Sequence, residues 1–354
     1  MLRRFLFASL LLAPLVVVMH YTVHPDKMVE FAVAAIALIP LAWLIGEATE
    51  HAAEHTGPGI GGFLNATFGN APELIIAMIA VQQGLTEVVR GSLSGSVIGN
   101  LLLVLGFSLI FGGRGEIDRQ SSYISLALVA AAGLLFLVPS IPSWNGDPER
   151  HLIETISIPI SIALLVLYLG TTWWTLRRHH QLHSADTDAD ADAEATGTGW
   201  SLRRSLGVLA AATVATAFVA EILVGSLEAF AEQAHLSDFF VAAVIVAIVG
   251  NAAEHGGAVV VAYRGKIKLA VEIALSSSAQ VAVFLIPAVA LLALLIDPLA
   301  LGFRPVEVWA LLGSAGLVSA LLARGRSTRG RGAVLIVAYI AIAALFFAVG
   351  DRNL

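Results

Sequence analysis

Long apolar segments separated by short polar stretches run through almost the whole of this sequence. Glycine, proline and charged residues divide the chain into about eleven such segments, each near the length that crosses a bilayer. They lie near residues 4–22, 28–53, 60–83, 86–111, 120–140, 151–177, 203–230, 237–263, 267–295, 304–323 and 332–350. Because lipid offers the backbone no hydrogen-bond partner, each segment is expected to be a helix. The pattern predicts an all-α integral membrane protein.

Composition agrees with this class. Of the 354 residues, 58% are hydrophobic and only 13% are charged, a balance typical of membrane proteins that cross the bilayer many times. The chain contains no cysteine, so a disulfide or a thiolate metal site is excluded. The basic residues form short clusters without interleaved aromatic residues, which argues against nucleic-acid binding.

The basic residues also predict the orientation in the membrane. If consecutive segments cross in alternating directions, the loops on the N-terminal side hold 15 of the 20 lysines and arginines. The opposite side holds Lys27, Arg90, Arg150, Arg304 and Arg352. The positive-inside rule then predicts a cytoplasmic N-terminus and an external C-terminus. The first segment could instead be a signal peptide, but no small-x-small cleavage site follows it, and its removal would leave the other ten segments oriented as before.

A polar linker between the sixth and seventh segments divides the chain into two halves. It has five acidic residues between Asp186 and Glu194, in "HSADTDADADAEATGTG". Five like charges so close together should stay solvated, and the linker is either a spacer or a weak collector of cations. The predicted organisation is an N-terminal transmembrane helix (1–24), a first five-helix repeat (25–178), an acidic cytoplasmic linker (179–201) and a second five-helix repeat (202–354).

Each five-helix repeat contains the same motif in its second segment. "GNAPELIIA" begins at Gly69 and "GNAAEHGGA" begins at Gly250, so each places an asparagine three residues before a glutamate. A serine-rich stretch follows each motif, and the distance of 26 residues from Asn70 to Ser96 is repeated from Asn251 to Ser277. These matches indicate an internal duplication. Because five is odd, the second copy must insert with the opposite orientation, an arrangement typical of secondary transporters with a site at the bilayer midplane.

The two motifs predict an oxygen-rich cation site. Residues three apart on a helix share a face, so Asn70 lies beside Glu73 and Asn251 beside Glu254. Calcium binds about six to eight oxygens, whereas zinc or copper would be expected to use more nitrogen or sulfur ligands. A buried glutamate can also be an inert hydrogen-bonding group, but an ionisable residue within the membrane is a functional candidate. Without a cation, two carboxylates removed from water would hold protons, so metal ions and protons would compete for the same oxygens.

The two motifs and their surroundings resemble the calcium/proton exchangers (CAX) of the cation/calcium exchanger superfamily. The similarity extends over "IGGFLNATFGNAPELIIA", "GSVIGNLLLVLG", "AEILVGSLE" and "SSSAQVAVFLIP", and thus over essentially the whole chain. An acidic segment between the halves is also a family trait. Sodium/calcium exchangers of the superfamily carry a Thr-Ser-rich motif, whereas "GNA" in both halves favours the proton-coupled branch.

The resemblance implies a transporter that exports cytoplasmic Ca²⁺ in exchange for H⁺ by alternating access. It implies that Glu73 and Glu254 bind Ca²⁺ with Asn70 and Asn251 beside them, and that no separate cofactor is needed, since Ca²⁺ is the substrate. It further implies supporting or proton-coupling roles for six polar residues: Glu50, Glu221, Glu228, His255, Ser277 and Gln280. We add Ser96 to this set, because it stands where Ser277 stands in the other repeat. Some relatives are homotrimers. The long N-terminal region of plant members does not precede the first segment, which suggests a bacterial plasma-membrane protein.

Other readings of the same residues stay open at this point. A Na⁺-coupled or mixed monovalent cation exchanger of the same superfamily is the main alternative, and a channel or a membrane enzyme is a weaker one. "HAAEH" (51–55) fits an inverted zinc-protease pattern, but the chain offers no soluble domain for such an enzyme. His255 could titrate during transport or simply hydrogen-bond across helices. Glu221 is the best candidate for a proton relay on its segment, and Glu228 could be only part of a polar mouth.

Overall fold

The computed structural model describes residues 2–183 and 199–352, so most of the acidic linker lies outside the described residues. Sixteen α-helices, four π-helical segments and a two-stranded sheet make up this part. The α-helices are α1 (Leu2–Ser9), α2 (Leu12–Val18), α3 (Lys27–Phe68), α4 (Ala71–Gln82), α5 (Thr86–Gly99), α6 (Leu105–Gly112), α7 (Arg119–Ser143), α8 (His151–His183), α9 (Leu202–Gln233), α10 (Asp238–Phe240), α11 (Ala247–Gly250), α12 (Ala252–Tyr263), α13 (Ile267–Gln280), α14 (Ile286–Ala293), α15 (Pro305–Leu322) and α16 (Arg329–Val349). The π-helical segments are η1 (Met19–Val23), η2 (Asn100–Val104), η3 (Val241–Val246) and η4 (Val281–Leu285), and the strands are β1 (Gly115–Glu116) and β2 (Arg326–Ser327).

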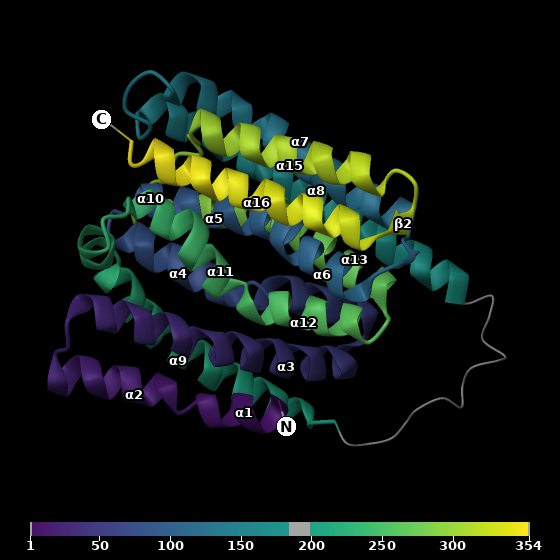
Figure 1. Cartoon of the computed structure of the whole chain (residues 1–354), viewed down its shortest axis with the longest axis horizontal. Coiled ribbons are helices and arrows are strands. Elements are labelled where there is room, and N and C mark those ends of the chain that lie inside the picture. Colours follow the sequence, from purple (N-terminus) through teal and green to yellow (C-terminus); the bar gives the residue numbers. More distant parts are fainter. Residues whose placement is uncertain (1, 184–198, 353–354) are drawn as a thin grey trace.

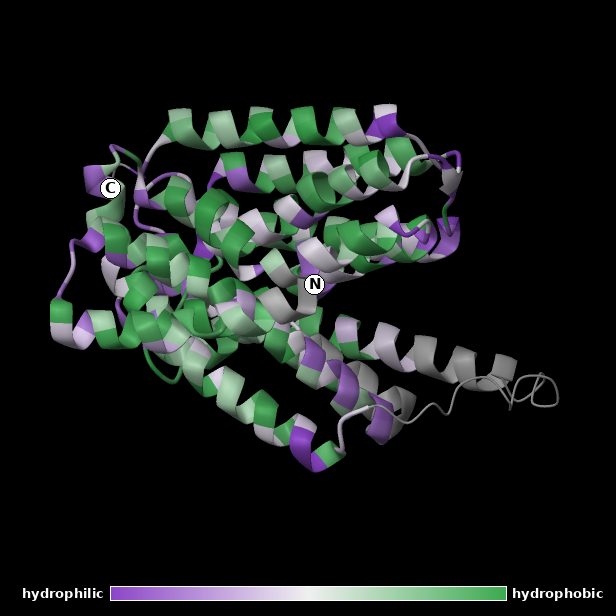
Figure 2. Ribbon diagram, turned by 60° about the horizontal axis from the view of Figure 1, so that its bottom comes forward, coloured by the Kyte–Doolittle hydropathy of each residue, from purple (hydrophilic) through white to green (hydrophobic). Residues whose placement is uncertain are grey.

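Most of the helices are long and apolar enough to cross a membrane. Within the described residues, 9 helices meet this condition, and the pair Asp238–Gly250 and Glu254–Tyr263, bent by 57°, would be a tenth. In Figure 2 the helices are green along most of their length, and purple residues gather where helices end. The protein is therefore a multi-pass, all-α membrane protein, while the count of eleven spans remains a prediction.

One predicted boundary is wrong. The sequence suggested a loop between segments 28–53 and 60–83, but α3 continues from Lys27 to Phe68 and the helix breaks only at Gly69 and Asn70. Pro72 is the second residue of α4, a place where proline is tolerated because it has no amide hydrogen and restricts the residue before it. Proline alone does not explain the break, since α3 contains Pro40 in its interior. Apolar length alone could not locate this break.

The duplication is visible in the bounds of the helices. Helices α4, α5 and α6 and the π-helical η2 recur as α12, α13, α14 and η4, with every first and last residue displaced by 181 positions. The left-handed glycines that follow α4 and α12, Gly84 and Gly265, keep the same displacement. The agreement covers helix ends, π-helices and turns, so the two halves share one local architecture.

Loops gather at two opposite ends of the molecule, and the equivalent helices α4 and α12 run toward opposite ends (Figure 1). The two repeats are therefore inverted. At one end β1 pairs with β2, and Lys268, just after α12, lies 3.4 Å from Asp118 beside β1. At the other end, at the left of Figure 1, lie the C-terminus and the loop after α4. Helix α4 thus runs toward one end and α12 toward the other.

The end that carries the C-terminus is held together by buried charges. Arg90 is 1% exposed and donates hydrogen bonds to Glu149 (2.5 Å), to Glu87 (2.6 Å) and to the carbonyl oxygen of Ala300 (3.0 Å). Arg304 donates to Glu87 over 2.9 Å. Removing one partner of a buried ion pair is usually costly, because the remaining charge loses its compensation. The sequence identified these arginines only as markers of orientation.

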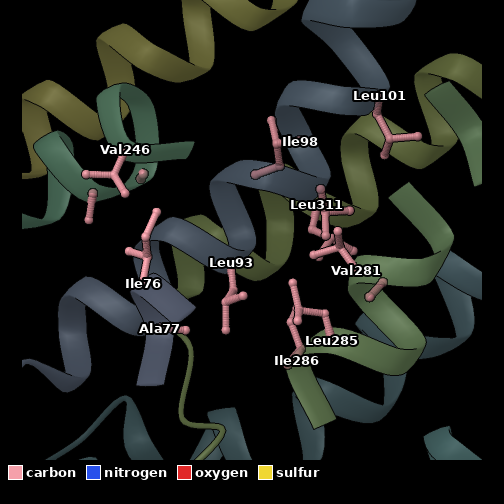
Figure 3. Packing of buried hydrophobic residues seen from close by; sticks show 14 of the residues in the cluster. Ile76, Ala77, Leu93, Ile98, Leu101, Val246, Val281, Leu285, Ile286 and Leu311 are labelled. Carbon is pink, nitrogen blue, oxygen red and sulfur yellow. The ribbon is translucent and has the colours of Figure 1, made fainter. Parts of the chain in front are cut away.

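The interior is packed with aliphatic side chains from both repeats. Figure 3 shows Ile76 and Ala77 of α4, Leu93 and Ile98 of α5 and residues of η4 and α14 pointing into one apolar cluster. In lipid, helices gain little from the hydrophobic effect and associate through close van der Waals packing, for which small residues are important. Gly95 of α5 is such a residue: a Cβ atom there would overlap the backbone of Ala243 in η3.

Candidate functional site

Both sequence motifs lie where a helix is interrupted in the interior of the protein. Asn70 separates α3 from α4 with φ −97° and ψ 16°, and Asn251 separates α11 from α12 with φ −89° and ψ 5°. This backbone region lies between the helical and extended conformations and is common at active sites. In the second half, which has no proline here, the Asn251 side chain donates to the carbonyl oxygen of Ala247 over 2.9 Å. Such side-chain bonds compete with the helical pattern.

Each interruption places a carboxylate in the first turn of the helix that follows it. Glu73 lies in the first turn of α4 and Glu254 in that of α12. The amino end of a helix carries a partial positive charge that favours a nearby anion. Glu73 is only 7% exposed and lines a small cavity together with Gly250, four residues before Glu254. The inverted repeat therefore brings two acidic groups together between two helix amino ends.

Glu254 belongs to a hydrogen-bond network that crosses the repeat interface. Ser277 of α13 donates to Glu254 and accepts a hydrogen bond from the Asn100 amide over 2.9 Å. The same amide lies 3.3 Å from the side-chain oxygen of Asn251. The His255 Nε2–H group donates to the Asn100 side-chain oxygen over 3.1 Å. Residues from η2, α12 and α13 thus fix the position of this carboxylate.

The motif asparagines each contact the opposite repeat. Asn251 donates to Ser96 of α5 over 2.8 Å, and Asn70 donates to the Gln280 side-chain oxygen of α13 over 3.4 Å. Ser96 and Ser277 occupy equivalent positions in the two halves. The structure therefore brings together the four predicted ligands and four of the predicted supporting residues, namely Ser96, Ser277, Gln280 and His255.

The two carboxylates are not equivalent. Glu254 accepts from Ser277, whereas one oxygen of Glu73, Oε2, is buried and has no hydrogen-bond partner among the described residues. Glu73 also lines a cavity of about 10 Å³ together with Ser92, Ser96 and Gly250. Such a volume is close to the minimum that holds one water molecule. A cation in this place would have to lose most of its hydration shell and replace it with protein oxygens.

Three predicted supporting residues lie outside this network. The side chains of Glu50 on α3 and of Glu221 and Glu228 on α9 are exposed, and no described side chain donates a hydrogen bond to any of them. The two histidines of the "HAAEH" segment also lie outside the network and contact Trp200. His55 donates to the carbonyl oxygen of Trp200 over 2.7 Å, and the ring of His51 stacks on the ring of Trp200. These histidines fasten α3 to the chain that precedes α9.

Asn100 is the central residue that sequence reasoning missed. It is buried, begins the π-helical segment η2, and contacts Asn251, Ser277 and His255. The equivalent position in the second half is Val281, which begins η4. Comparison of the repeats could detect only shared residues, so a polar residue present in one half alone gave no signal. An amide inside "GSVIGNLLLVLG" was the only hint.

Replacement of Asn100 by valine is expected to weaken cation binding at this site about thirtyfold, since at least two hydrogen bonds of roughly 1 kcal/mol each are lost. Titration of the purified protein with the cation would measure the effect. Ser278→Ala is the control, because Ser278 is buried on α13 and, among the described residues, its side chain bonds only to the carbonyl oxygen of Ala274 in the same helix. An unchanged half-saturating concentration in Asn100→Val would contradict a role for this network.

Comparison with known proteins agrees with the fold. A family model described as sodium/calcium exchanger protein matches residues 27–177 and 204–348. The Ca(2+)/H(+) antiporter ChaA of Bacillus subtilis is 37% identical over 92% of this chain and 93% of its own, and the Ca(2+)/H(+) antiporter of Aphanothece halophytica is 34% identical over 96% and 95%. The solved structure of native YfkE superposes with a TM-score of 0.81 and 34% identity, covering 98% of this chain and all of its own. The chain belongs to the sodium/calcium exchanger protein family.

Proposed function

We propose that this protein exports Ca²⁺ from the cytoplasm in exchange for protons, with Glu73 and Glu254 as the groups that bind either ion. Relatives that cover nearly the whole chain are named Ca²⁺/H⁺ antiporters. The observation that carries the residue assignment is the meeting of two carboxylates, each at a helix interruption, at the interface of two inverted repeats. Transporters of this architecture bind their ions at such interrupted helices.

Competition between the two ions accounts for exchange. A divalent cation can accept both carboxylates together with the side-chain oxygens of Asn70 and Asn251, which satisfies the demand of Ca²⁺ for many oxygen ligands. Protons can neutralise the same carboxylates when the metal leaves. An empty site with two buried negative charges is costly in low dielectric. The site should therefore change its exposure when it is loaded with Ca²⁺ or with protons, and rarely when it is empty.

The difference between the two carboxylates suggests a division of roles. Glu254 has a fixed hydrogen-bond donor in Ser277, and this donor is itself held by Asn100. Glu73 faces the small cavity with one oxygen unpaired by described residues. We propose that Glu254 is the positioned ligand and that Glu73 moves to complete the coordination of Ca²⁺. Proton-coupling roles for His255, Glu50, Glu221 and Glu228 remain part of this proposal.

Sodium coupling is the alternative that the relatives do not favour. The decisive experiment uses proteoliposomes free of Na⁺, in which an imposed pH gradient should drive Ca²⁺ movement against its own gradient. A Na⁺-coupled exchanger would stay inactive until Na⁺ is added. A channel would pass Ca²⁺ without moving protons in return.

The asparagines provide a second test. Asn70→Ala or Asn251→Ala removes a neutral oxygen ligand while leaving both carboxylates in place. We expect the apparent affinity for Ca²⁺ to fall about tenfold, with a much smaller change in the pH dependence of transport, because a proton needs one oxygen and calcium needs many. Ca²⁺ titrations at several pH values would separate the two effects. Equal losses for Ca²⁺ and for protons would mean that the asparagines maintain the fold of the site and do not bind the metal.

The charge distribution supports a cytoplasmic N-terminus, an external C-terminus and residence in a bacterial plasma membrane. Alternation of the predicted spans puts 15 of the 20 lysines and arginines on the N-terminal side of the membrane. A homotrimer remains an expectation from the family. Both proposals can be tested by protease accessibility in oriented vesicles and by the mass of the protein in detergent.

A further inference from the structure

A groove between α4 and α9 contains a carboxylate that the central network does not use. It has a volume of about 640 Å³ and is lined by Ile79, Gln82, Gln83, Val214, Ala217, Phe218 and Glu221. The side chains of Gln82, Gln83 and Glu221 are exposed to it. One carboxylate and two amides thus share an otherwise apolar depression, and each can offer oxygen to a cation.

The depth of Glu221 makes this carboxylate significant. It lies twelve residues before Gln233, the last residue of α9, which is roughly 18 Å along the helix axis. Glu221 therefore lies well inside the candidate membrane span of α9, where an ionised group without a partner is expensive. No described side chain donates a hydrogen bond to it. Water in the groove, a proton or a cation must satisfy this group.

The groove is joined to the central site by a single helix. Helix α4 carries Glu73 in its first turn and Gln82 at its end, nine residues or roughly 13 Å apart. The end of α4 lies at the face of the molecule that carries the C-terminus (Figure 1). A cation in the groove would thus be one short helix away from the buried carboxylates, on the side toward that face.

The second repeat has no equivalent of this groove chemistry. At the displacement of 181 residues that relates α4 to α12, Gln82 and Gln83 correspond to Tyr263 and Arg264. An arginine repels a cation where the first half offers an amide oxygen. The arrangement is therefore one-sided, unlike the paired motifs of the central site.

We propose that the groove between α4 and α9 is an outer cation site, in which Glu221, Gln82 and Gln83 hold a partly hydrated divalent cation between the central site and the face bearing the C-terminus. This inference rests on the proposed function, for which the groove is the station where Ca²⁺ is released or captured. The amides and the single carboxylate favour weak binding, because they leave most of the hydration shell in place. Weak binding suits a station from which the ion must depart again.

The natural absence of cysteine permits a direct test. Ala217→Cys places a thiol in the groove one helical turn from Glu221, and a membrane-impermeant methanethiosulfonate reagent is added to vesicles from the side of the C-terminus. We expect the thiol to react and Ca²⁺ to slow the reaction at least about threefold, since an occupied site blocks access. Adding Glu221→Gln should remove the protection. Adding Glu232→Gln, an exposed acid on the same helix, should leave it intact.

The same measurement is made with Glu73→Gln and Glu254→Gln added together, so that the outer site is assessed independently of transport. Protection that persists in this background supports the proposal even if the central assignment fails. Three results would overturn it: a thiol that does not react, protection that survives Glu221→Gln, or protection that vanishes with the central glutamates. The last would show that Ca²⁺ acts from the central site. Transport provides a second readout, in which Glu221→Gln should raise half-saturating Ca²⁺ about threefold on this face alone.

Discussion

Glu73→Gln and Glu254→Gln are each expected to reduce Ca²⁺/H⁺ exchange at least about 100-fold, the largest functional effect that the structure suggests. Glutamine keeps the shape of the side chain, but it removes a negative charge that binds Ca²⁺ and the group that carries a proton. A hydrogen bond or ligand contact to a charged group contributes about 1.5–3 kcal/mol, and loss of the charge in a buried site costs more. Transport of radioactive Ca²⁺ driven by a pH gradient in proteoliposomes measures the result.

Glu116→Gln is the matched control for these two variants. Glu116 is an exposed glutamate on β1, at the end of the molecule that the positive-inside rule places in the cytoplasm. The control should exchange Ca²⁺ at nearly the normal rate, because its carboxylate is solvated and far from the helix interruptions. Near-normal exchange in both central variants would refute the assignment of the transport site. Loss in only one would show that the repeats bind different ions.

The sequence predicted that the motif residues gather at the repeat interface, because the same motif occurs in both repeats. One glutamate in an apolar helix can be either a functional group or an inert hydrogen-bonding group. An asparagine and a glutamate that recur at equal spacing in two inverted halves are much harder to explain as inert groups. Across the repeat interface, Asn251 contacts Ser96 and Asn70 contacts Gln280. The predicted duplication is also visible in the structure, since the ends of α4, α5 and α6 recur 181 residues later in α12, α13 and α14.

The features that the sequence did not predict are contacts between residues far apart in the chain and the end of one helix. Arg90 bonds to Ala300, and the pairing cannot be seen in the pattern around either residue. Asn100 has no counterpart in the second repeat, so comparison of the halves overlooked it. The boundary of α3 was misplaced because apolar length describes how much helix a segment can form and does not show where the backbone turns.

Gly95→Ala is expected to be the most destabilising small substitution in the membrane domain. Helix α5 crosses η3 so closely at this residue that a Cβ atom would overlap the carbonyl group of Ala243. The obstacle is backbone, so no change of rotamer can relieve it, and α5 must move away from η3. Overpacking of a tight core costs about 1–3 kcal/mol and occasionally more. In lipid, where helices are held chiefly by close packing, that separation has no hydrophobic compensation.

Gly99→Ala is the control one turn further along α5, because a Cβ atom at Gly99 has no atom within 4 Å. Alanine is favoured over glycine in a helix by about 0.8–1 kcal/mol, so this variant should be as stable as the natural protein or slightly more stable. Thermal unfolding in detergent should show a lower midpoint for Gly95→Ala alone. Its Ca²⁺ affinity should fall as well, since Ser96 of α5 bonds to Asn251, just beyond η3 and α11. Equal midpoints for the two variants would mean that α5 and η3 do not pack this closely, and that the contact does not hold the two repeats in register around the site.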